Sequence, residues 1–236
     1  MPANPKKALI TAAATALLLT GTAACGSDGG ALDGLAAEEV AEKAQESMKN
    51  LDSLTMKGEI TQEEGLMKLD VSLTTDGECS GTVAIDDQEM EFIQVGDYSY
   101  MKASDAFWDA QGADGAAMND LVAGRWMRTS GDSGFGDICA LEDLLDSMND
   151  DSGDEKMEVT DGGKVNGRST VKLTVTEDDE TTDVYVANSD DAYIVRVMQE
   201  GGDEPGQIDL GDFNKKFTFS APAEDDYVDM DSLSQQ

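Results

Sequence analysis

Hydrophobic and polar residues follow two different periods along this chain. Near the start, apolar residues recur every three or four positions, which predicts one amphipathic helix within residues 35–51. Its apolar face consists of Leu35, Ala36, Val40, Ala44, Met48 and Leu51. Apolar and polar residues then alternate, as is typical of strands with one buried face. This alternation predicts about five strands between residues 54 and 100, joined by short turns.

The alternation is interrupted between residues 103 and 150. Ser104 is a suitable N-cap for a short helix that carries Phe107 and Trp108, and residues 114–123 are also predicted to be helical. A strand at residues 125–128 and an amphipathic helix within residues 137–148 complete this part. Alternation resumes over residues 171–219, with Gly162-Gly163 and residues 200–202 predicted as turns.

The N-terminal segment has the features of an export signal. Lys6 and Lys7 precede an uncharged apolar stretch over residues 8–20, and small residues lead to Cys25. The segment also resembles a bacterial lipobox, in which the cysteine after the cleavage site is lipidated. We therefore expect a signal peptide over residues 1–24, and a lipidated Cys25 with a flexible tether over residues 25–34. The protein would be exported and anchored to the cell membrane on the extracellular side. The alternative is an ordinary signal peptide with an incidental Cys25.

Composition excludes several classes of function. The 236 residues include 50 Asp and Glu against 16 Lys and Arg, a net charge of −34, so we expect no nucleic-acid partner. The chain has no His, which removes the Ser-His-Asp and Cys-His nucleophile systems. Among so many carboxylates, an acidic pair is no sign of catalysis. We predict no enzyme activity, no catalytic residue, no metal and no cofactor. The acidity suits solubility, or a salty habitat in which carboxylates repel less.

Two cysteines remain after the predicted anchor. Cys79 lies on the third predicted strand and Cys139 on the predicted helix within residues 137–148. Disulfides persist outside the cytoplasm, so we predict that these two residues form a structural disulfide, which stabilises by about 4 kcal/mol for a loop of this length. A redox or metal-binding thiol pair is the alternative, although it would favour a closer spacing.

Several short motifs occur in a recognisable order. The later ones are Val165-Asn166-Gly167, Asp183-Val184-Tyr185-Val186, Leu210-Gly211-Asp212-Phe213-Asn214 and Phe217-Thr218-Phe219-Ser220-Ala221-Pro222. The earlier ones are residues 77–83, Ala106-Phe107-Trp108 and Gly124-Arg125-Trp126. Their order resembles the LolA-like superfamily, especially the LppX/LprG-type lipoproteins of actinobacteria, over nearly all of residues 35–222.

This resemblance implies a single domain over residues 35–222. Ala221-Pro222 ends the last predicted strand, so we expect an acidic mobile tail over residues 223–236. The implied fold class is α+β with a strongly curved antiparallel sheet, for which the alternation predicts about 9–11 strands. Such a sheet is an unclosed half-barrel with helices over its concave face. The resemblance also implies an apolar cavity for a lipid or other hydrophobic ligand. The residues predicted to line it are Leu54, Met56, Leu69, Val71, Val83, Ile85 and Phe92.

Two functions stay open at this point. The first is a membrane-anchored, surface-exposed lipoprotein that binds or carries a lipid or hydrophobic ligand in its cavity. The second is a non-enzymatic structural or protein-interaction lipoprotein with the same fold and a filled core. An apolar pocket of several hundred Å³ would favour the first function, and a dense core would favour the second.

Overall fold

The structure is a computed structural model that describes residues 29–131, 136–147, 156–177, 180–202 and 204–233. Cys25 and the predicted signal peptide lie outside these residues. The helices are α1 (Ala37–Lys49), α2 (Asp105–Ala110), α3 (Gly112–Val122), α4 (Gly136–Cys139), α5 (Leu141–Ser147) and α6 (Met230–Leu233). The strands of the first half are β1 (Ser53–Gln62), β2 (Gly65–Thr74), β3 (Cys79–Ile85), β4 (Gln88–Val95), β5 (Tyr98–Ala103) and β6 (Trp126–Ser130). Those of the second half are β7 (Lys156–Val165), β8 (Arg168–Glu177), β9 (Glu180–Ala187), β10 (Ile194–Gln199), β11 (Gly206–Gly211) and β12 (Tyr227–Asp229).

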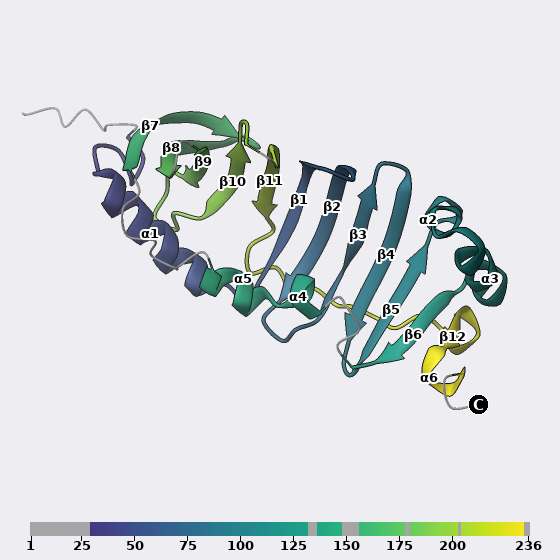
Figure 1. The fold of residues 1–236 in the computed structure, drawn as a ribbon. Helices are drawn as coiled ribbons and strands as arrows, with labels where there is room; N and C mark the ends of the chain where they lie inside the picture. The colour runs from purple at the N-terminus through teal and green to yellow at the C-terminus, as the bar shows by residue number, and fades with distance from the viewer. Residues whose placement is uncertain (1–28, 132–135, 148–155, 178–179, 203, 234–236) are drawn as a thin grey trace, which may run out of the picture.

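In the described part of the chain, twelve strands form one sheet in the order β12-β6-β5-β4-β3-β2-β1-β11-β10-β9-β8-β7 (Figure 1). Every neighbouring pair is antiparallel except β12 and β6, which run parallel. The two edge strands do not pair, so the sheet stays open. This confirms the predicted α+β fold with an unclosed antiparallel sheet.

The sheet bends where β1 meets β11. Figure 1 shows β7–β10 curling over, whereas β1–β6 lie side by side as a broader surface. A Cβ atom on Gly58 would lie 2.1 Å from the carbonyl oxygen of Gln207, and one on Gly206 would lie 2.7 Å from that of Glu59. Real Cβ atoms do not approach so closely, so the two strands come together here only because both positions are glycine.

Helices α1 and α5 cover part of one sheet face. Val40, Ala44 and Met48 on α1 are buried, as the three-to-four spacing predicts. The main core joins these two helices to the first strands and β11 through Met48, Leu51, Leu54, Val71, Leu73, Cys79, Phe92, Cys139, Leu141, Leu145 and Leu210. A second cluster joins the start of α1 to β8 and β9. Helices α1 and α5 therefore lie on the concave face, as predicted.

A disulfide between Cys79 and Cys139 links β3 to the end of α4, and the two Cα atoms are 5.5 Å apart. Both cysteines are buried in the main core. The predicted pairing is confirmed. The helix predicted within residues 137–148 is divided into α4 and α5, and Met148 lies outside the described residues.

Two details of the second half differ from the sequence predictions. Gly162-Gly163 is not a turn but lies within β7, because a register shift between Asp161 and Gly163 forms a bulge in which Gly163 has a φ of 65°. The alternating residues 217–219 do not form a strand. Phe217 and Phe219 are half-buried and their rings stack on each other. Their alternation with polar residues therefore reflects this packing and not pairing with a neighbouring strand.

The segment predicted as a mobile tail instead carries β12 and α6. Arg128 on β6 forms an ion pair with Asp229 and donates a hydrogen bond to the hydroxyl of Tyr227 at 3.0 Å. The Arg128 guanidinium also lies over the rings of Tyr98 and Tyr227, at 4.6 and 4.8 Å from their centroids. These contacts hold the end of the chain against the sheet edge.

Candidate ligand-binding face

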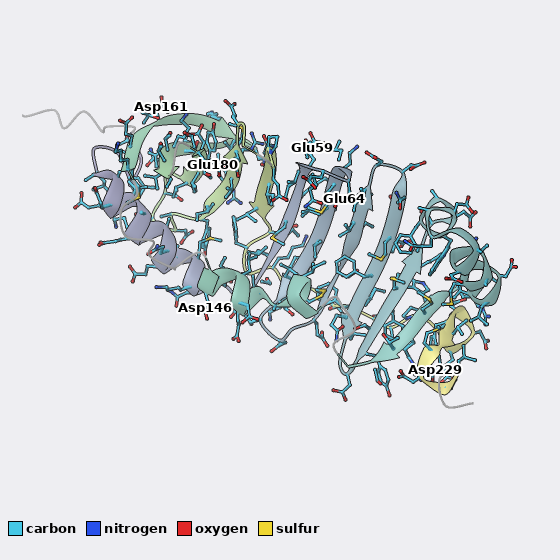
Figure 2. All side chains as sticks on the ribbon, viewed as in Figure 1. Glu59, Glu64, Asp146, Asp161, Glu180 and Asp229 are labelled. Atoms are coloured by element: carbon cyan, nitrogen blue, oxygen red, sulfur yellow. A yellow bond between two sulfur atoms is a disulfide. The ribbon has the colours of Figure 1, made fainter. Side chains whose placement is uncertain are left out.

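The strand register arranges the concave face in four parallel rows of side chains. The two covered rows, nearest to α1 and α5, are Leu54, Leu73 and Cys79, and then Leu210, Met56, Val71, Gly81 and Phe92. The two open rows are Val197, Ile208, Gly58, Leu69, Val83 and Met90, and then Gln199, Gly206, Ile60, Met67 and Ile85. Figure 2 shows the two ends of this face: Glu64 lies at the strand ends near the open rows, and Asp146 lies on α5.

Burial decreases from the covered rows to the open rows. Leu54 and Leu73 are fully buried, and Val71 and Phe92 are 1% exposed. In contrast, the apolar side chains of the open rows are all half-buried. Because the side chains of α1 and α5 pack over the covered rows, the apolar surface left for a partner lies in the open rows.

The structure brings all seven predicted ligand-contacting residues to this one face. Leu54, Met56, Val71 and Phe92 lie in the covered rows. Leu69, Val83 and Ile85 lie in the open rows. Leu54, Val71 and Phe92 are core residues, so the other four predicted residues are the ones that a ligand can contact directly. Their contact with a ligand stays a prediction.

Sequence reasoning missed the second-half members of the open rows. Val197 pairs with Ile208, and Ile208 pairs with Gly58 of β1 across about 150 residues of sequence. Alternation indicated which residues of each strand share a face. It carried no information about which distant strand would lie beside β1.

A small hollow of about 150 Å³ opens at this end of the face, where β1, β9, β10 and β11 meet. Its walls are Ile60, Thr182, Val197, Gln199, Glu204, Gly206 and Ile208. The walls therefore combine three aliphatic side chains with the polar Thr182 and Gln199, and Glu204 is their one charged residue. This volume is smaller than the roughly 300–1,000 Å³ of a pocket for a drug-sized ligand.

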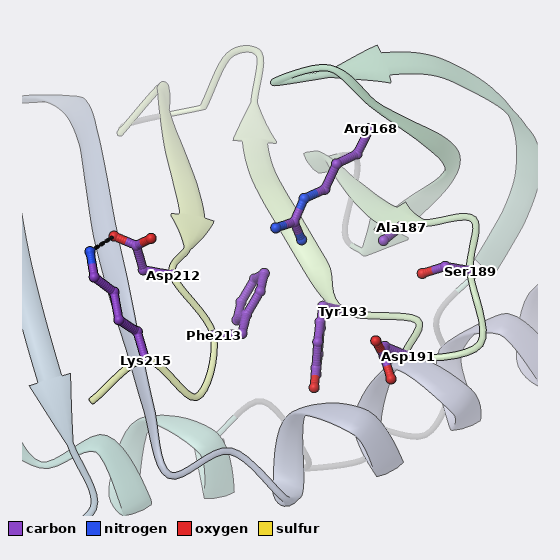
Figure 3. Close-up of a pocket in the computed structure, with 8 residues that line it drawn as sticks. All are labelled: Arg168, Ala187, Ser189, Asp191, Tyr193, Asp212, Phe213 and Lys215. Carbon is purple, nitrogen blue, oxygen red and sulfur yellow. Dashed lines mark hydrogen bonds and ion pairs between the residues drawn. The ribbon is translucent and has the colours of Figure 1, made fainter. Parts of the chain in front are cut away.

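A larger hollow of about 600 Å³ lies on the outer face (Figure 3). Its lining includes Ala187, whose neighbour Val186 points into the concave core, so the two side chains lie on opposite faces. The Tyr193 ring stacks on Phe213 at 4.5 Å, and the Arg168 guanidinium lies 5.6 Å from the Phe213 centroid.

This outer hollow combines aromatic and charged groups. The Lys215 ammonium is 3.0 Å from the carboxylate of Asp212, and Arg168 and Asp191 add one charge of each sign. Such a lining has no continuous apolar surface for an aliphatic chain, unlike the open rows of the concave face.

Ion pairs organise the outer face of the sheet. Lys172 pairs with Asp183 at 2.9 Å and Arg196 with Asp209 at 2.5 Å, each across neighbouring strands. The hydrogen bond from Arg196 lowers the pKa of Asp209, although partial burial opposes it. These carboxylates are therefore ionised at neutral pH, and their ion pairs stabilise the sheet. They do not have the raised pKa that a general acid requires.

Neither a metal centre nor a membrane-spanning helix occurs in the described ranges. Within them, no three or more cysteine and carboxylate groups are placed to hold one metal ion. In the same residues, no helix has both the length and the apolar character needed to cross a bilayer. What the arrangement does offer is an aliphatic surface on the concave face of the sheet.

An open antiparallel sheet with helices over part of its concave face is also the fold of two solved mycobacterial lipoproteins, which agrees with the resemblance drawn from the sequence. The fold is that of LprF from Mycobacterium bovis, with a TM-score of 0.57, 14% identity, and coverage of 79% of this chain and 97% of LprF. It is also that of the Mycobacterium tuberculosis lipoprotein LppX, with a TM-score of 0.50, 16% identity, and coverage of 77% of this chain and 97% of LppX. No protein-family model and no curated protein sequence matches this chain. At these identities the likeness establishes the fold.

Proposed function

We propose that this protein is an exported lipoprotein, anchored through acyl chains on Cys25, that holds a lipid or other hydrophobic ligand on the open rows of its concave face. The observation that carries the proposal is the gradient of burial across that face. Apolar side chains that stay partly exposed side by side mark a candidate contact surface for a ligand or partner.

The side chains of the open rows suit an aliphatic ligand of variable shape. Leu69, Val83 and Ile208 form a fixed branched surface, and Met67 and Met90 add flexible thioethers that adapt to different chains. Burial of aliphatic surface against these rows would contribute about 25 cal/mol per Å².

The point at which the chain enters the domain supports this placement. The backbone N–H of Leu32 donates to the Oδ1 atom of Asn188 at 2.8 Å, just beyond the end of β9. Thr182, which lines the hollow near the start of β9, lies roughly 20 Å away along the strand. A tether from Cys25 would therefore attach at the opposite end of β9 from the open rows and leave them accessible.

Native mass spectrometry of the mature protein, purified gently from the membranes of its own cell, tests this function. We expect a mass above that of the lipidated chain. Organic extraction should remove the additional mass, and analysis of the extract should identify it as a non-covalent ligand. The proposal would be contradicted if the parent protein were detected only at the mass of its lipidated chain, under conditions in which a control lipid carrier keeps its ligand.

The small hollow favours a second candidate function, a lipoprotein that presents the same fold to a protein partner. Its volume of about 150 Å³ and the dense packing of Leu54, Val71 and Phe92 are what a filled core would give. In that case the open rows would bury against another protein. Crosslinking in the native membrane would then yield a protein adduct, and extraction would yield no ligand.

A further inference from the structure

The turns at the open end of the concave face form a continuous edge. The N–H of Thr61 donates to the carbonyl of Pro205 at 2.8 Å, which joins β1 to the loop between β10 and β11. The N–H of Leu66 donates to the Oδ1 atom of Asp86 at 3.2 Å, which joins the β1–β2 turn to the β3–β4 turn.

The same edge continues to the start of β9. A Cβ atom on Gly202 would lie 2.9 Å from Oε1 of Glu180, so the first residue of β9 lies against the β10–β11 loop. Three turns and the start of β9, which are distant in sequence, thus border the partly exposed apolar rows and the hollow beside them.

This acidic edge has no positive charge in its turns. The described residues among 62–66, 85–88, 180 and 199–206 contain no Lys or Arg. The exposed carboxylates of the edge are Glu63, Glu64, Asp86, Asp87, Glu180, Glu200 and Glu204. In the described residues none of these seven forms an ion pair. Glu204 also lines the hollow itself.

The outer face of the sheet differs from this edge because three of its carboxylates pair with cations of adjacent strands. The pairs are Lys57 with Asp70, Lys172 with Asp183, and Arg196 with Asp209. These three cations lie on the strands of the sheet, whereas the described residues of the edge turns contain no cation.

We propose that the open rows and the acidic edge together bind a cationic amphiphile, with its aliphatic chain on the rows and its positive group among the edge carboxylates. This inference rests on the proposed function, because it specifies the ligand class for the same face. An anionic headgroup at this place would meet several unpaired carboxylates and be repelled. A cationic group stays hydrated at the exposed edge, so it gains attraction without the cost of burial.

Titration calorimetry of the delipidated mature chain at low ionic strength tests the inference with three probes that share one tail. These probes are decyltrimethylammonium, decyl maltoside and decyl sulfate, each kept below its micelle concentration. We expect the cationic probe to bind about tenfold more tightly than the neutral one, since several carboxylates act at short range, and the anionic probe to bind most weakly. Added salt should reduce the preference as the Debye length shortens.

A matched pair of variants locates the effect. The edge variant carries Glu63→Gln, Glu64→Gln, Asp86→Asn and Asp87→Asn. The control variant removes the same number of charges from exposed positions of α1 and α5 through Glu42→Gln, Glu46→Gln, Asp143→Asn and Asp146→Asn. We expect the edge variant to lose most of the preference for the cationic probe and the control variant to keep it.

The other outcomes distinguish a failure of this inference from a failure of the proposed function. An equal loss in both variants would show attraction by net charge alone and overturn the acidic edge as a recognition element. Binding of the neutral probe without a cationic preference would overturn this inference and leave the proposed function standing. Failure of all three probes to bind would contradict the inference and the proposed function together.

Discussion

Tryptophan substitutions at two valines on the same face distinguish a covered row from an open row. Val71 lies in a covered row and is 1% exposed, whereas Val83 lies in an open row and is half-buried. A Cβ atom on Gly81, which pairs with Val71, would lie 2.9 Å from Cγ2 of that valine, so the space beside Val71 is already filled. Val83 instead lies between Leu69 and Met90, both half-buried.

The expected free energies of unfolding follow from this difference. Val71→Trp forces an indole into a packed core and should destabilise by about 1–3 kcal/mol or more. For a chain of this length, that corresponds to a fall in Tm of roughly 2–4 °C per kcal/mol. Val83→Trp extends over half-exposed neighbours, so its cost should stay below about 1 kcal/mol, since the side chain can spread over the open surface.

Ligand binding should change in the opposite order. The indole at position 83 would cover the open rows and reduce the lipid recovered with the protein, although the fold stays intact. The assays are thermal unfolding of the delipidated proteins and quantification of extracted lipid for parent and variants. If Val83→Trp destabilised as strongly as Val71→Trp and the parent carried no lipid, the open rows would be ordinary core and the reasoning would fail.

Three further predictions concern the anchor, the disulfide and the ion pairs. Cys25→Ala should release the protein into the medium, and firm retention in the membrane fraction would refute the lipid anchor. Replacing Cys79 and Cys139 by Ser should lower the free energy of unfolding by about 2–4 kcal/mol in denaturant titrations, whereas an unchanged midpoint would contradict a stabilising disulfide. The lowered pKa of Asp209 means that its pair with Arg196 stabilises above the unfolded-state pKa and that this contribution disappears as the pH falls through the folded-state pKa. Asp209→Asn should therefore lose less stability than the parent between about pH 5 and pH 2, and equal losses would disprove the role of the pair.

Local sequence patterns predicted most elements of the fold because each depends on nearby residues. The spacing of Val40, Ala44 and Met48 was enough to place α1, and Ser104 capped α2 by accepting the N–H of Phe107 at 3.3 Å. The disulfide was predictable because the chain carries an export signal and only two cysteines remain after Cys25. In the second half, the glycine pair at 162 and 163 lies in a β-bulge of β7, and the sequence alone does not distinguish such a bulge from a turn.

The candidate site was only partly predictable because it depends on contacts between distant segments. Alternation placed Leu69, Val83 and Ile85 on the correct face, but it did not show that α1 and α5 would cover Leu54 and leave the other rows open. The hollow requires β11 beside β1, and that pairing depends on the close approach at Gly58 and Gly206. The placement of β12 against β6 likewise rests on Arg128 and Asp229, which are about 100 residues apart.

Photocrosslinking tests the central claim most directly, because it reports where a lipid lies on the folded protein. The mature chain would be loaded with a lipid that carries a diazirine in its acyl chain, irradiated, digested and mapped by mass spectrometry. The account predicts labels on peptides that contain Leu69, Val83 and Ile208, and weaker labelling after Val83→Trp. Labels confined to the outer hollow around Tyr193 and Phe213, or no labels above the level of an unfolded control, would contradict it.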